Sequence, residues 1–528
     1  MNRGSPLRQA KIALKKAIVN AVIRFLPGLV RNVVARSKAA QDDVRILTHA
    51  ITFSRDPVLS LNFYSGDGCF AKSVIWRSLV KLEETEPRVF GLLIENRSSV
   101  HSDELRLKLE LKHVLRNESI LTKESFDGLL LPYLKLVRLA EEPKGLASMF
   151  ATVVIARAPV ERIEETLGQL GTDTLQLTEF QKVKFLSRLA NNGFHDSFIS
   201  WSKELNSGMT QAGKLKVSLM RAHLFGRDSD SFRVLEEQFA NLGFDISRQY
   251  TQGVRPLYDR IPVDKNYLAA KFDRERLDSL RDFILDSVAA GNALSYIRVG
   301  DGECYGMADD ALVDEKGITR QEIHWWGEQL EDHQRLELQA QFKSSLESAD
   351  ILGVPTVLRL IKDFNLAKTD SYPPNSLISR ILCVMQGVGP YLENRMVVED
   401  QSNLYLFNRE FVNDLFNNAK KVCVISGVNS KLVSELAPSN KNLTTIEIPT
   451  HRLLRDKDVG SSIEGILPHV YKRYLDEISA LSEPGVVFLI SAGFIGKIFI
   501  AEAAKRGAVA LDVGQSLVNS VSAEGYAV

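Results

Sequence analysis

Two acidic residues separated by one glycine, Asp301 and Glu303, are the strongest candidates for metal chemistry in this sequence. They follow an apolar run, and Gly300 and Gly302 beside them permit a tight turn and the close approach of a bulky group. In an extended segment, residues i and i+2 point to the same side, so both carboxylates are expected to face one ligand. Two hard oxygen donors suit Mg²⁺ or Mn²⁺ bound to a diphosphate. The alternative is a glycine-rich turn with two solvated acids.

A second motif, at residues 491–497, has the composition of a phosphate-binding turn. Gly493 and Gly496 follow an apolar run and precede Lys497. Backbone N–H groups at the N-terminus of a helix attract phosphate, and Lys497 would add positive charge. The segment is not a Walker A loop, because only two residues separate its glycines and no Ser or Thr follows the lysine. The alternative is tight strand–helix packing with Lys497 in solvent.

Two further polar positions follow apolar runs near the end of the chain. Asp512 interrupts the run at residues 508–514, and we expect it to bind a ribose, base or acceptor hydroxyl, or to cap the next segment. His451 and Arg452 follow the run at residues 444–448 and could reach a diphosphate. The alternative for this pair is a solvated loop.

These motifs belong to an alternating pattern that begins at about residue 255. Apolar β-branched runs alternate with amphipathic stretches, which predicts a mostly parallel sheet covered by helices, an α/β fold. Ligands in such sheets bind beyond the carboxyl ends of the strands. The predicted strands are residues 294–299, 351–354, 421–426, 444–448, 486–491 and 508–513. The predicted helices are residues 277–290, 328–346, 469–481 and 496–506.

Residues 41–250 predict a mainly helical domain. Apolar residues recur at three- and four-residue spacing in residues 103–115 and 179–190, whereas residues 88–94 and 149–155 are short strand candidates. Asp-Ser-Phe occurs at residues 196–198 and again 34 residues later, which is the period of tetratricopeptide-type helical hairpins. A non-repetitive bundle is the alternative. Such a domain is expected to bind a partner protein or an acceptor, or to mediate self-association.

A second Gly-Asp-Gly sequence lies within that region, at residues 66–68. Cys69 follows it in place of a second carboxylate. Because Gly-Asp-Gly is common in turns, we expect a turn here and no metal site.

The bulk composition sets the class of protein. The chain of 528 residues is long enough for two or three domains, and its 66 basic and 66 acidic residues give no basic excess for nucleic-acid binding. The four cysteines are scattered without a CxxC pair, which argues against a structural zinc site and a disulfide framework. A cytoplasmic protein is therefore expected.

Residues 1–40 differ from the rest in charge, with nine basic residues and no acidic one. Apolar residues recur there at helical spacing, and Pro27 is expected to kink or split the segment. A basic amphipathic helix can lie on an anionic membrane surface, so peripheral contact with the cytoplasmic membrane face is one prediction. The alternatives are a helix docked on the protein, a frayed tail or an organellar transit peptide. A secretory signal is less expected, because Arg24 and Arg31 interrupt the apolar stretch.

The motifs of residues 255–528 together resemble the GT-D-type glycosyltransferase family, a Rossmann-like domain with a DxE motif. That family carries an Arg-Phe-Gly-Asp-Gly-Glu-like segment after its first strand, and residues 298–303 are similar except for Val299. It ends with a strand, a glycine turn and a helix, and then a strand that reads roughly Ala-Leu-Asp-Ile-Gly. Residues 491–497 and 510–514 are similar to these two parts, in the same order.

The resemblance implies transfer of a sugar, of the hexosyltransferase type, from a nucleoside-diphosphate sugar to a glycan, glycolipid or glycoprotein. A UDP-sugar is the expected donor, and Asp301 and Glu303 would act in catalysis and bind Mn²⁺ or Mg²⁺. The expected donor contacts are Arg298, Gly300, Gly302, His451, Gly493, Gly496, Lys497 and Asp512.

Residues 310–420 show no clear correspondence to the family. Glu322 and His324 are candidates for the base that activates the acceptor, and Trp325 and Trp326 for stacking on a sugar or for packing a lid. Two alternatives stay open for the whole protein. One is a metal-dependent nucleotide hydrolase, and the other is a helical adaptor with a nucleotide-binding but non-catalytic α/β domain.

Overall fold

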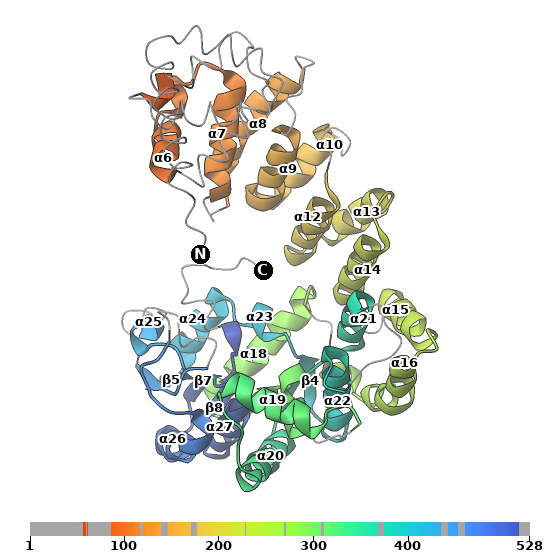
Figure 1. The fold of residues 1–528 in the computed structure, drawn as a ribbon, viewed down its shortest axis with the longest axis vertical. Helices are drawn as coiled ribbons and strands as arrows, with labels where there is room; N and C mark the ends of the chain where they lie inside the picture. Colours follow the sequence, from red (N-terminus) through yellow and green to blue (C-terminus); the bar gives the residue numbers. More distant parts are fainter. Residues whose placement is uncertain are drawn as a thin grey trace, which may run out of the picture. The chain divides into compact units, whose positions relative to one another are not determined.

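A computed structural model describes residues 56–59, 61, 86–116, 120–138, 146–170, 177–226, 229–268, 271–307, 311–367, 374–434, 442–451 and 460–516. The chain divides into two compact units, Met1–Gly213 and Lys214–Val528, and each is described by itself (Figure 1). The basic segment at residues 1–40 and the Gly-Asp-Gly at residues 66–68 lie outside the described residues. Among the described helices, none combines the length and the apolar character needed to cross a membrane.

The described part of the first unit is built from helices, which confirms the mainly helical prediction. Residues 103–115 and 179–190 lie within two of these helices, α7 and α12. The longer helices are α6 (Pro87–Glu95), α7 (Asp103–Arg116), α8 (Lys123–Arg138), α9 (Leu146–Arg157), α10 (Val160–Leu170), α12 (Glu179–Asn191) and α13 (His195–Leu205).

The two predicted strands of this unit are wrong, because both segments are helical. Residues 88–94 lie within α6, which begins with Pro87 in its first turn, where a missing N–H breaks no hydrogen bond. Residues 149–155 lie within α9, where Phe150, Ala151 and Val153 are buried on different sides of the helix. A helix buried nearly all round has no apolar period, so its sequence cannot be distinguished from that of a buried strand.

The two Asp-Ser-Phe segments each lie in the first turn of a helix. They open α13, which packs on α12, and α15 (Asp230–Ala240), which follows α14 (Gln211–Phe225). Gly193 and Gly226, just beyond the ends of α12 and α14, have φ of 79° and 75°. The assignment of these helices to the tetratricopeptide type stays a prediction.

An eight-stranded sheet forms the centre of the second unit, which confirms the α/β prediction. The strand order is β1-β4-β3-β2-β8-β7-β5-β6, and all seven strand pairs are parallel. The strands are β1 (Asn266–Tyr267), β2 (Leu294–Arg298), β3 (Ile351–Val354), β4 (Met396–Glu399), β5 (Lys421–Ser426), β6 (Leu443–Glu447), β7 (Val486–Ser491) and β8 (Val509–Asp512). Six of them match the six predicted strands, whereas the sequence patterns do not predict β1 and β4.

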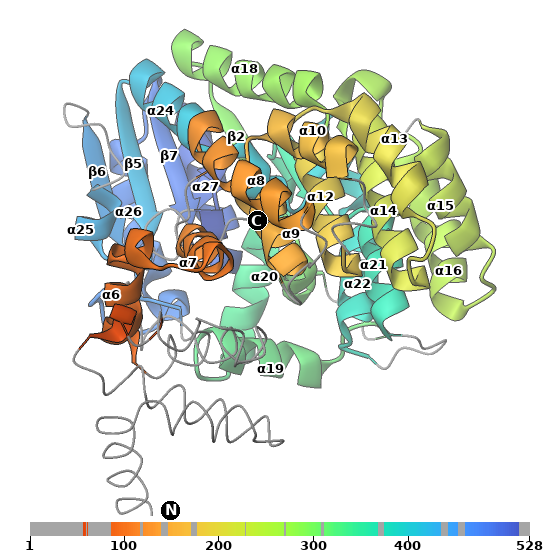
Figure 2. The same cartoon turned by 90° about the horizontal axis from the view of Figure 1, so that it is seen from above.

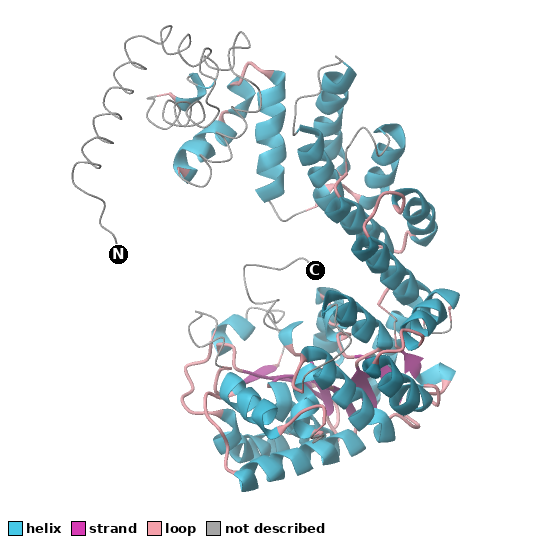
Figure 3. Cartoon of the chain, turned by 45° about the vertical axis from the view of Figure 1, so that its right-hand side comes forward, coloured by secondary structure: helices cyan, strands magenta, loops and turns pink. Residues whose placement is uncertain are grey.

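Helices cover both faces of this sheet (Figure 3). One face packs against α20 (Asp332–Glu347), α21 (Val357–Ala367), α22 (Leu377–Val388), α26 (Leu467–Leu481) and α27 (Gly493–Lys505). The other packs against α18 (Arg274–Ala290) and α24 (Arg409–Asn418). The first core also includes Phe232 and Phe239 of α15 and Ile246 of α16 (Asp245–Gln249), so the second unit starts before the boundary expected at residues 250–255.

Strands β2 and β8 are neighbours at the centre of the sheet, where the chain changes direction. The chain leaves β2 for β3 on one side and reaches β8 from β7 on the other. Strands β2, β5, β6 and β7 are labelled in Figure 2. In open α/β sheets the ligand crevice lies at such a point, outside the carboxyl ends of the strands. The segments after β2, β3, β4 and β8 are therefore the place to look for a site.

Candidate active site

The segment after β2 forms a short 3-10 helix, η5 (Asp301–Gly306), and the predicted extended conformation is wrong. Glu303 accepts a hydrogen bond from the backbone N–H of Gly300 at 2.8 Å, which closes the turn. A 3-10 helix has three residues per turn, so residues i and i+2 do not share a face. The two carboxylates diverge as a result: that of Asp301 contacts α21 and α22, whereas that of Glu303 contacts α27.

The carboxylate of Asp301 pairs with two arginines. Its Oδ1 lies 2.9 Å from Nη2 of Arg359 on α21, and its Oδ2 lies 3.0 Å from Nη1 of Arg380 on α22. Arg359 also pairs with Asp400, which follows β4 and is buried. The Asp301 side chain is 28% exposed. Asp301, Arg359, Arg380 and Asp400 are called the Asp301 group below.

The carboxylate of Glu303 belongs to a more deeply buried set of charges. Nζ of Lys497 lies 3.0 Å from Oε1 of Glu303 and 2.9 Å from Oδ2 of Asp512, and it donates to the carbonyl of Gly493 at 3.1 Å. The side chains of Glu303, Lys497 and Asp512 are only 14%, 5% and 6% exposed. Lys497 is thus held between two carboxylates and does not lie in solvent. With Arg298 these three residues are called the Glu303 group.

Arg298 clamps the ends of the central strands together. Its guanidinium donates to the carbonyl and to Oδ1 of Asp512 at 3.2 and 3.0 Å, to the carbonyl of Asp400 at 2.9 Å and to Oδ1 of Asn403 at 2.6 Å. Gly514 leaves room for it, because a β-carbon there would collide with Nη2 of Arg298. The clamp therefore positions η5 relative to β8 and the segment after β4.

The buried ion pairs keep their charges at neutral pH. Burial alone would raise the pKa of Asp512, but Arg298 and Lys497 outweigh it and hold the pKa below the usual 3.8. Burial alone would lower the pKa of Lys497, but Asp512 and Glu303 outweigh it and hold the pKa above the usual 10.5. Charge pairing thus prevails over desolvation for both groups.

The two groups balance in charge, with four carboxylates and four cations, and the neighbouring Asp363 leaves one carboxylate in excess. Asp363 also lies near Arg359, at 3.9 Å, so the residues joined by these ion pairs are five carboxylates and four cations: Asp301, Glu303, Asp363, Asp400 and Asp512 with Arg298, Arg359, Arg380 and Lys497. An uncompensated charge in a partly buried place favours the binding of a cation. A diphosphate would add further negative charge at this point.

Trp325 lies beside η5, on the side of the site toward His451. The half-buried indole of Trp325 lies against Gly302 and stacks on Phe494, with ring centroids 6.2 Å apart. Its neighbour His324 lies 5.9 Å from the ring of His451, which follows β6. The end of α19 (Glu315–Trp325) thus brings His324, Trp325 and His451 to the edge of the site, while Trp326 is buried.

Glu322 does not suit the role of acceptor base. It is fully buried and accepts hydrogen bonds from the hydroxyl of Tyr305 at 2.8 Å, from Nε of Arg335 at 2.7 Å and from the backbone of Leu330 at 3.0 Å. These contacts fix α19 against η5 and α20. Because this carboxylate is buried and its oxygens accept hydrogen bonds from the protein, it stabilises the fold and cannot reach an acceptor hydroxyl.

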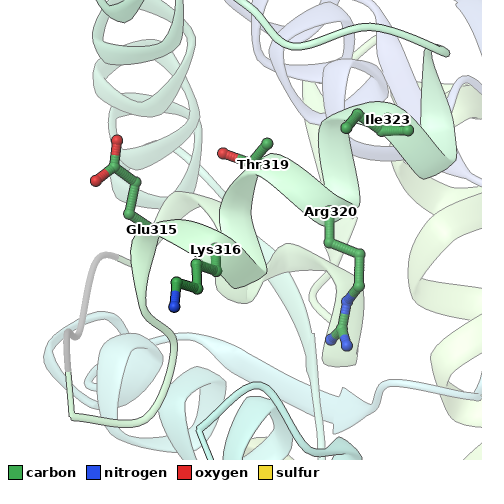
Figure 4. Close-up of a pocket in the computed structure, with 5 residues that line it drawn as sticks. All are labelled: Glu315, Lys316, Thr319, Arg320 and Ile323. Atoms are coloured by element: carbon green, nitrogen blue, oxygen red, sulfur yellow. The ribbon is translucent and has the colours of Figure 1, made fainter.

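A surface pocket lies along α19 and is separate from the ion pairs. It is lined by Glu315, Lys316, Thr319, Arg320 and Ile323 (Figure 4). No member of the Asp301 group or the Glu303 group lines it. The pocket therefore gives no evidence for a donor site.

The donor set of the Asp301 group fits a divalent cation. In the described parts of the chain, no three His, Cys, Asp or Glu side chains converge as a metal site. A cation bound by one or two carboxylates and by the phosphates of its ligand does not require such a set. Asp301 offers hard, partly exposed oxygens, and Oδ1 of Asp400 is a buried carboxylate oxygen with no hydrogen-bond partner among the described residues.

The structure brings together most of the predicted site residues and adds three. Arg298, Gly300, Asp301, Gly302, Glu303, Gly493, Lys497 and Asp512 gather at the ends of β2, β7 and β8, whereas Gly496 packs on Ala492 and Ile490. Their contacts with a donor stay predictions. The added residues are Arg359, Arg380 and Asp400. Asp400 has a sequence signal, since it ends a short apolar run, but neither arginine stands out in its helix.

Comparison with known proteins identifies the domain that carries this site. Residues 277–519 match the family model described as the GT-D fold-like domain. Strands β2 to β8 therefore belong to a GT-D-like domain, a glycosyltransferase-like fold, and the resemblance is confirmed over residues 277–519. Searches of curated proteins and of solved structures gave no significant match.

Proposed function

We propose that the protein is a glycosyltransferase that moves a sugar from a nucleoside-diphosphate sugar, a UDP-sugar by expectation, to a hydroxyl of a glycan, glycolipid or glycoprotein. One observation carries the proposal. Within a GT-D-like domain, the partly exposed carboxylate of Asp301 lies at the carboxyl end of the central strand β2 and contacts two arginines. Carboxylates and cations together at this point suit a diphosphate and its counter-ion.

In the proposed reaction, the bond from the anomeric carbon to the diphosphate breaks and a bond to the acceptor oxygen forms. The acceptor loses its proton to a base, and negative charge develops on the departing diphosphate. A divalent cation held by Asp301 would supply positive charge to that leaving group. Arginine side chains fixed in advance at the same place would stabilise the same charge.

The surroundings suggest roles for two more side chains. The indole of Trp325 is half-buried beside Gly302, and an aromatic face of this kind can stack on a sugar or a base. His451 follows the edge strand β6 and lies near His324, which is exposed. We propose Trp325 as a stacking surface and the His324–His451 edge as the place where the acceptor approaches.

We propose that the protein acts in the cytoplasm, with residues 1–40 in contact with an anionic membrane face. Cys304, Cys383 and Cys423 are buried and, among the described residues, form no disulfide, which supports a reducing compartment. Deletion of residues 1–40 should reduce binding to vesicles of anionic lipid. Unchanged binding would remove the membrane proposal. As a separate proposal, the helical first unit binds the acceptor or a protein partner.

The function is tested by a screen of nucleotide sugars. Thermal stability is measured with each sugar nucleotide, with and without Mn²⁺, and donors that bind are then offered to acceptor glycans and glycolipids. The proposal expects one donor to raise the melting temperature in a Mn²⁺-dependent way and to be consumed with formation of a glycosylated product. Donor hydrolysis without transfer would favour a hydrolase, and no turnover with any donor would favour an adaptor.

A further inference from the structure

We infer that Arg359 and Arg380 form an anion-binding pair for the donor diphosphate, and that the carboxylate of Asp301 occupies this pair in the ligand-free protein. The inference rests on the proposed function and names the residues that hold the leaving group. It also gives Asp301 a second role, as a competitor of the ligand, besides its proposed contact with a cation.

The geometry of the pair is that of an anion clamp. The two guanidinium groups come from different helices, α21 and α22. Each pairs with a different carboxylate oxygen of Asp301, Arg359 with Oδ1 at 2.9 Å and Arg380 with Oδ2 at 3.0 Å. Arginine binds carboxylate and phosphate oxygens with the same planar fork. A carboxylate between two arginines is thus a chemical stand-in for a phosphate group.

The pair also has unused hydrogen-bonding capacity. In the described part of the chain, Nε of Arg380 and Oγ1 of Thr356 are buried polar atoms with no hydrogen-bond partner. Thr356 is 1% exposed, and it lies between the carboxyl end of β3 and the start of α21, the helix of Arg359. Buried polar groups are normally satisfied, so unpaired ones beside a charged cluster point to a missing ligand.

The other two cations of the cluster do not offer the same opportunity. The guanidinium of Arg298 donates four hydrogen bonds within the protein, to Asp512, Asp400 and Asn403. Lys497 is 5% exposed and lies between two carboxylates. Arg380 is 23% exposed and has Asp301 as its ion-pair partner, so a ligand can replace that partner at the lowest cost.

Asp301 therefore couples the diphosphate to a cation. A diphosphate must displace Asp301 from the arginines, and this competition weakens its binding when no cation is present. A divalent cation that accepts Asp301 as a ligand leaves Arg380 and Nη2 of Arg359 available to the diphosphate, while Nη1 of Arg359 keeps Asp400. By linkage, cation and diphosphate should each raise the affinity for the other by the same factor.

The test is calorimetric titration of the full chain with inorganic pyrophosphate, first in EDTA and then with MgCl₂ in excess of pyrophosphate. Asp301→Asn is expected to bind pyrophosphate more tightly than wild type in EDTA, by at least about threefold, because the competing charge is gone. The same variant is expected to bind more weakly than wild type in MgCl₂. Arg380→Gln is expected to bind at least about tenfold more weakly than wild type in both buffers.

Two further variants keep the test decisive. Arg380→Lys keeps the charge and loses the fork, so it should bind with intermediate affinity even if Arg380→Gln folds poorly by circular dichroism. Arg320→Gln is the control, because Arg320 is an exposed arginine on α19 that donates to the carbonyl of Asn375 and belongs to neither charged group. It should bind pyrophosphate like wild type.

The outcomes separate this inference from the proposed function. Affinity in EDTA that is unchanged or reduced in Asp301→Asn, or wild-type affinity in both Arg380 variants, overturns the anion pair even if the protein transfers sugar. Pyrophosphate binding that depends on Arg380, with no turnover of any sugar nucleotide, keeps the pair and overturns the glycosyltransferase proposal.

Discussion

The Asp301 group and the Glu303 group begin two residues apart in the chain, yet they differ in burial and in pairing. The side chain of Asp301 is about twice as exposed as that of Glu303, at 28% against 14%. Unpaired buried atoms occur in the Asp301 group, at Arg380 and Asp400, whereas no atom of the Glu303 group is among the unpaired atoms of the described residues. We therefore propose different tasks for these two acids: Glu303 holds the strand ends together, and Asp301 would face the ligand.

The largest effect should come from the Glu303 group, through Lys497→Met. The substitution leaves the carboxylates of Glu303 and Asp512 buried without their shared cation, and breaking such a pair costs about 3–5 kcal/mol. Denaturant unfolding should show this loss. Lys505→Met, at an exposed position of the same helix, should change stability by less than about 0.5 kcal/mol. Equal stability of the two variants would mean that the Glu303 group is not structural.

Asp301→Asn should act on turnover and leave the fold intact. Loss of the ligand-facing charge should lower kcat/KM for sugar transfer roughly 10²-fold, the size of effect seen when one electrostatic contact is removed from an active site. The melting temperature should stay close to that of wild type, because Arg359 keeps Asp400 and Arg380 is partly solvated. If Asp301→Asn is much less stable than wild type but transfers sugar at the wild-type rate when folded, the Asp301 group is structural and its proposed role in turnover is wrong.

Acid should weaken the Glu303 group in a defined pH range. The pKa of Asp512 is below the usual 3.8, because Arg298 and Lys497 outweigh its burial. Its contribution to stability is therefore complete above the unfolded pKa and is lost as the pH falls through the folded pKa. Stability of wild type and Asp512→Asn, measured between pH 7 and pH 3, should converge on acidification. A constant difference would show that Asp512 stabilises the protein through contacts other than its charge.

The smallest effect should come from the aromatic edge, through Trp325→Leu. The substitution keeps an apolar side chain against Phe494 but removes the aromatic face beside Gly302. If that face stacks on the donor, KM for the donor should rise about 3- to 10-fold while kcat changes little. An unchanged KM would confine Trp325 to packing.

The sequence was a good guide where a strand is long and buried, and a poor one elsewhere. The runs at residues 421–426 and 486–491 are six-residue apolar strands in the structure, as expected. Strand β1 has two residues, which is too short for a pattern to emerge, and β4 has only three apolar residues before its glutamate. The buried helix α9 was predicted as a strand, because burial on nearly all sides removes the apolar period of a helix.

The sequence marked residues that gather at the strand ends, but it did not reveal their geometry. The motif at residues 298–303 marked Asp301 and Glu303, yet the same-side argument assumed an extended chain. Glu303 folds back onto the N–H of Gly300 and forms a turn, which is the contact that the N3 glutamate of a capping box makes with the N-cap residue. Arg359 and Arg380 reach Asp301 from 58 and 79 positions away in the sequence, so only the tertiary fold brings them there.

The central claim is that Asp301 faces the ligand and Glu303 supports the fold, and one paired measurement tests it directly. UDP affinity in the presence of Mn²⁺ and melting temperature are measured together for Asp301→Asn and Glu303→Gln. We predict that Asp301→Asn loses at least about tenfold in UDP affinity with a nearly unchanged melting temperature, whereas Glu303→Gln shows the larger drop in melting temperature and the smaller loss of affinity. The reverse pattern, or equal effects of the two substitutions on both quantities, would contradict the account.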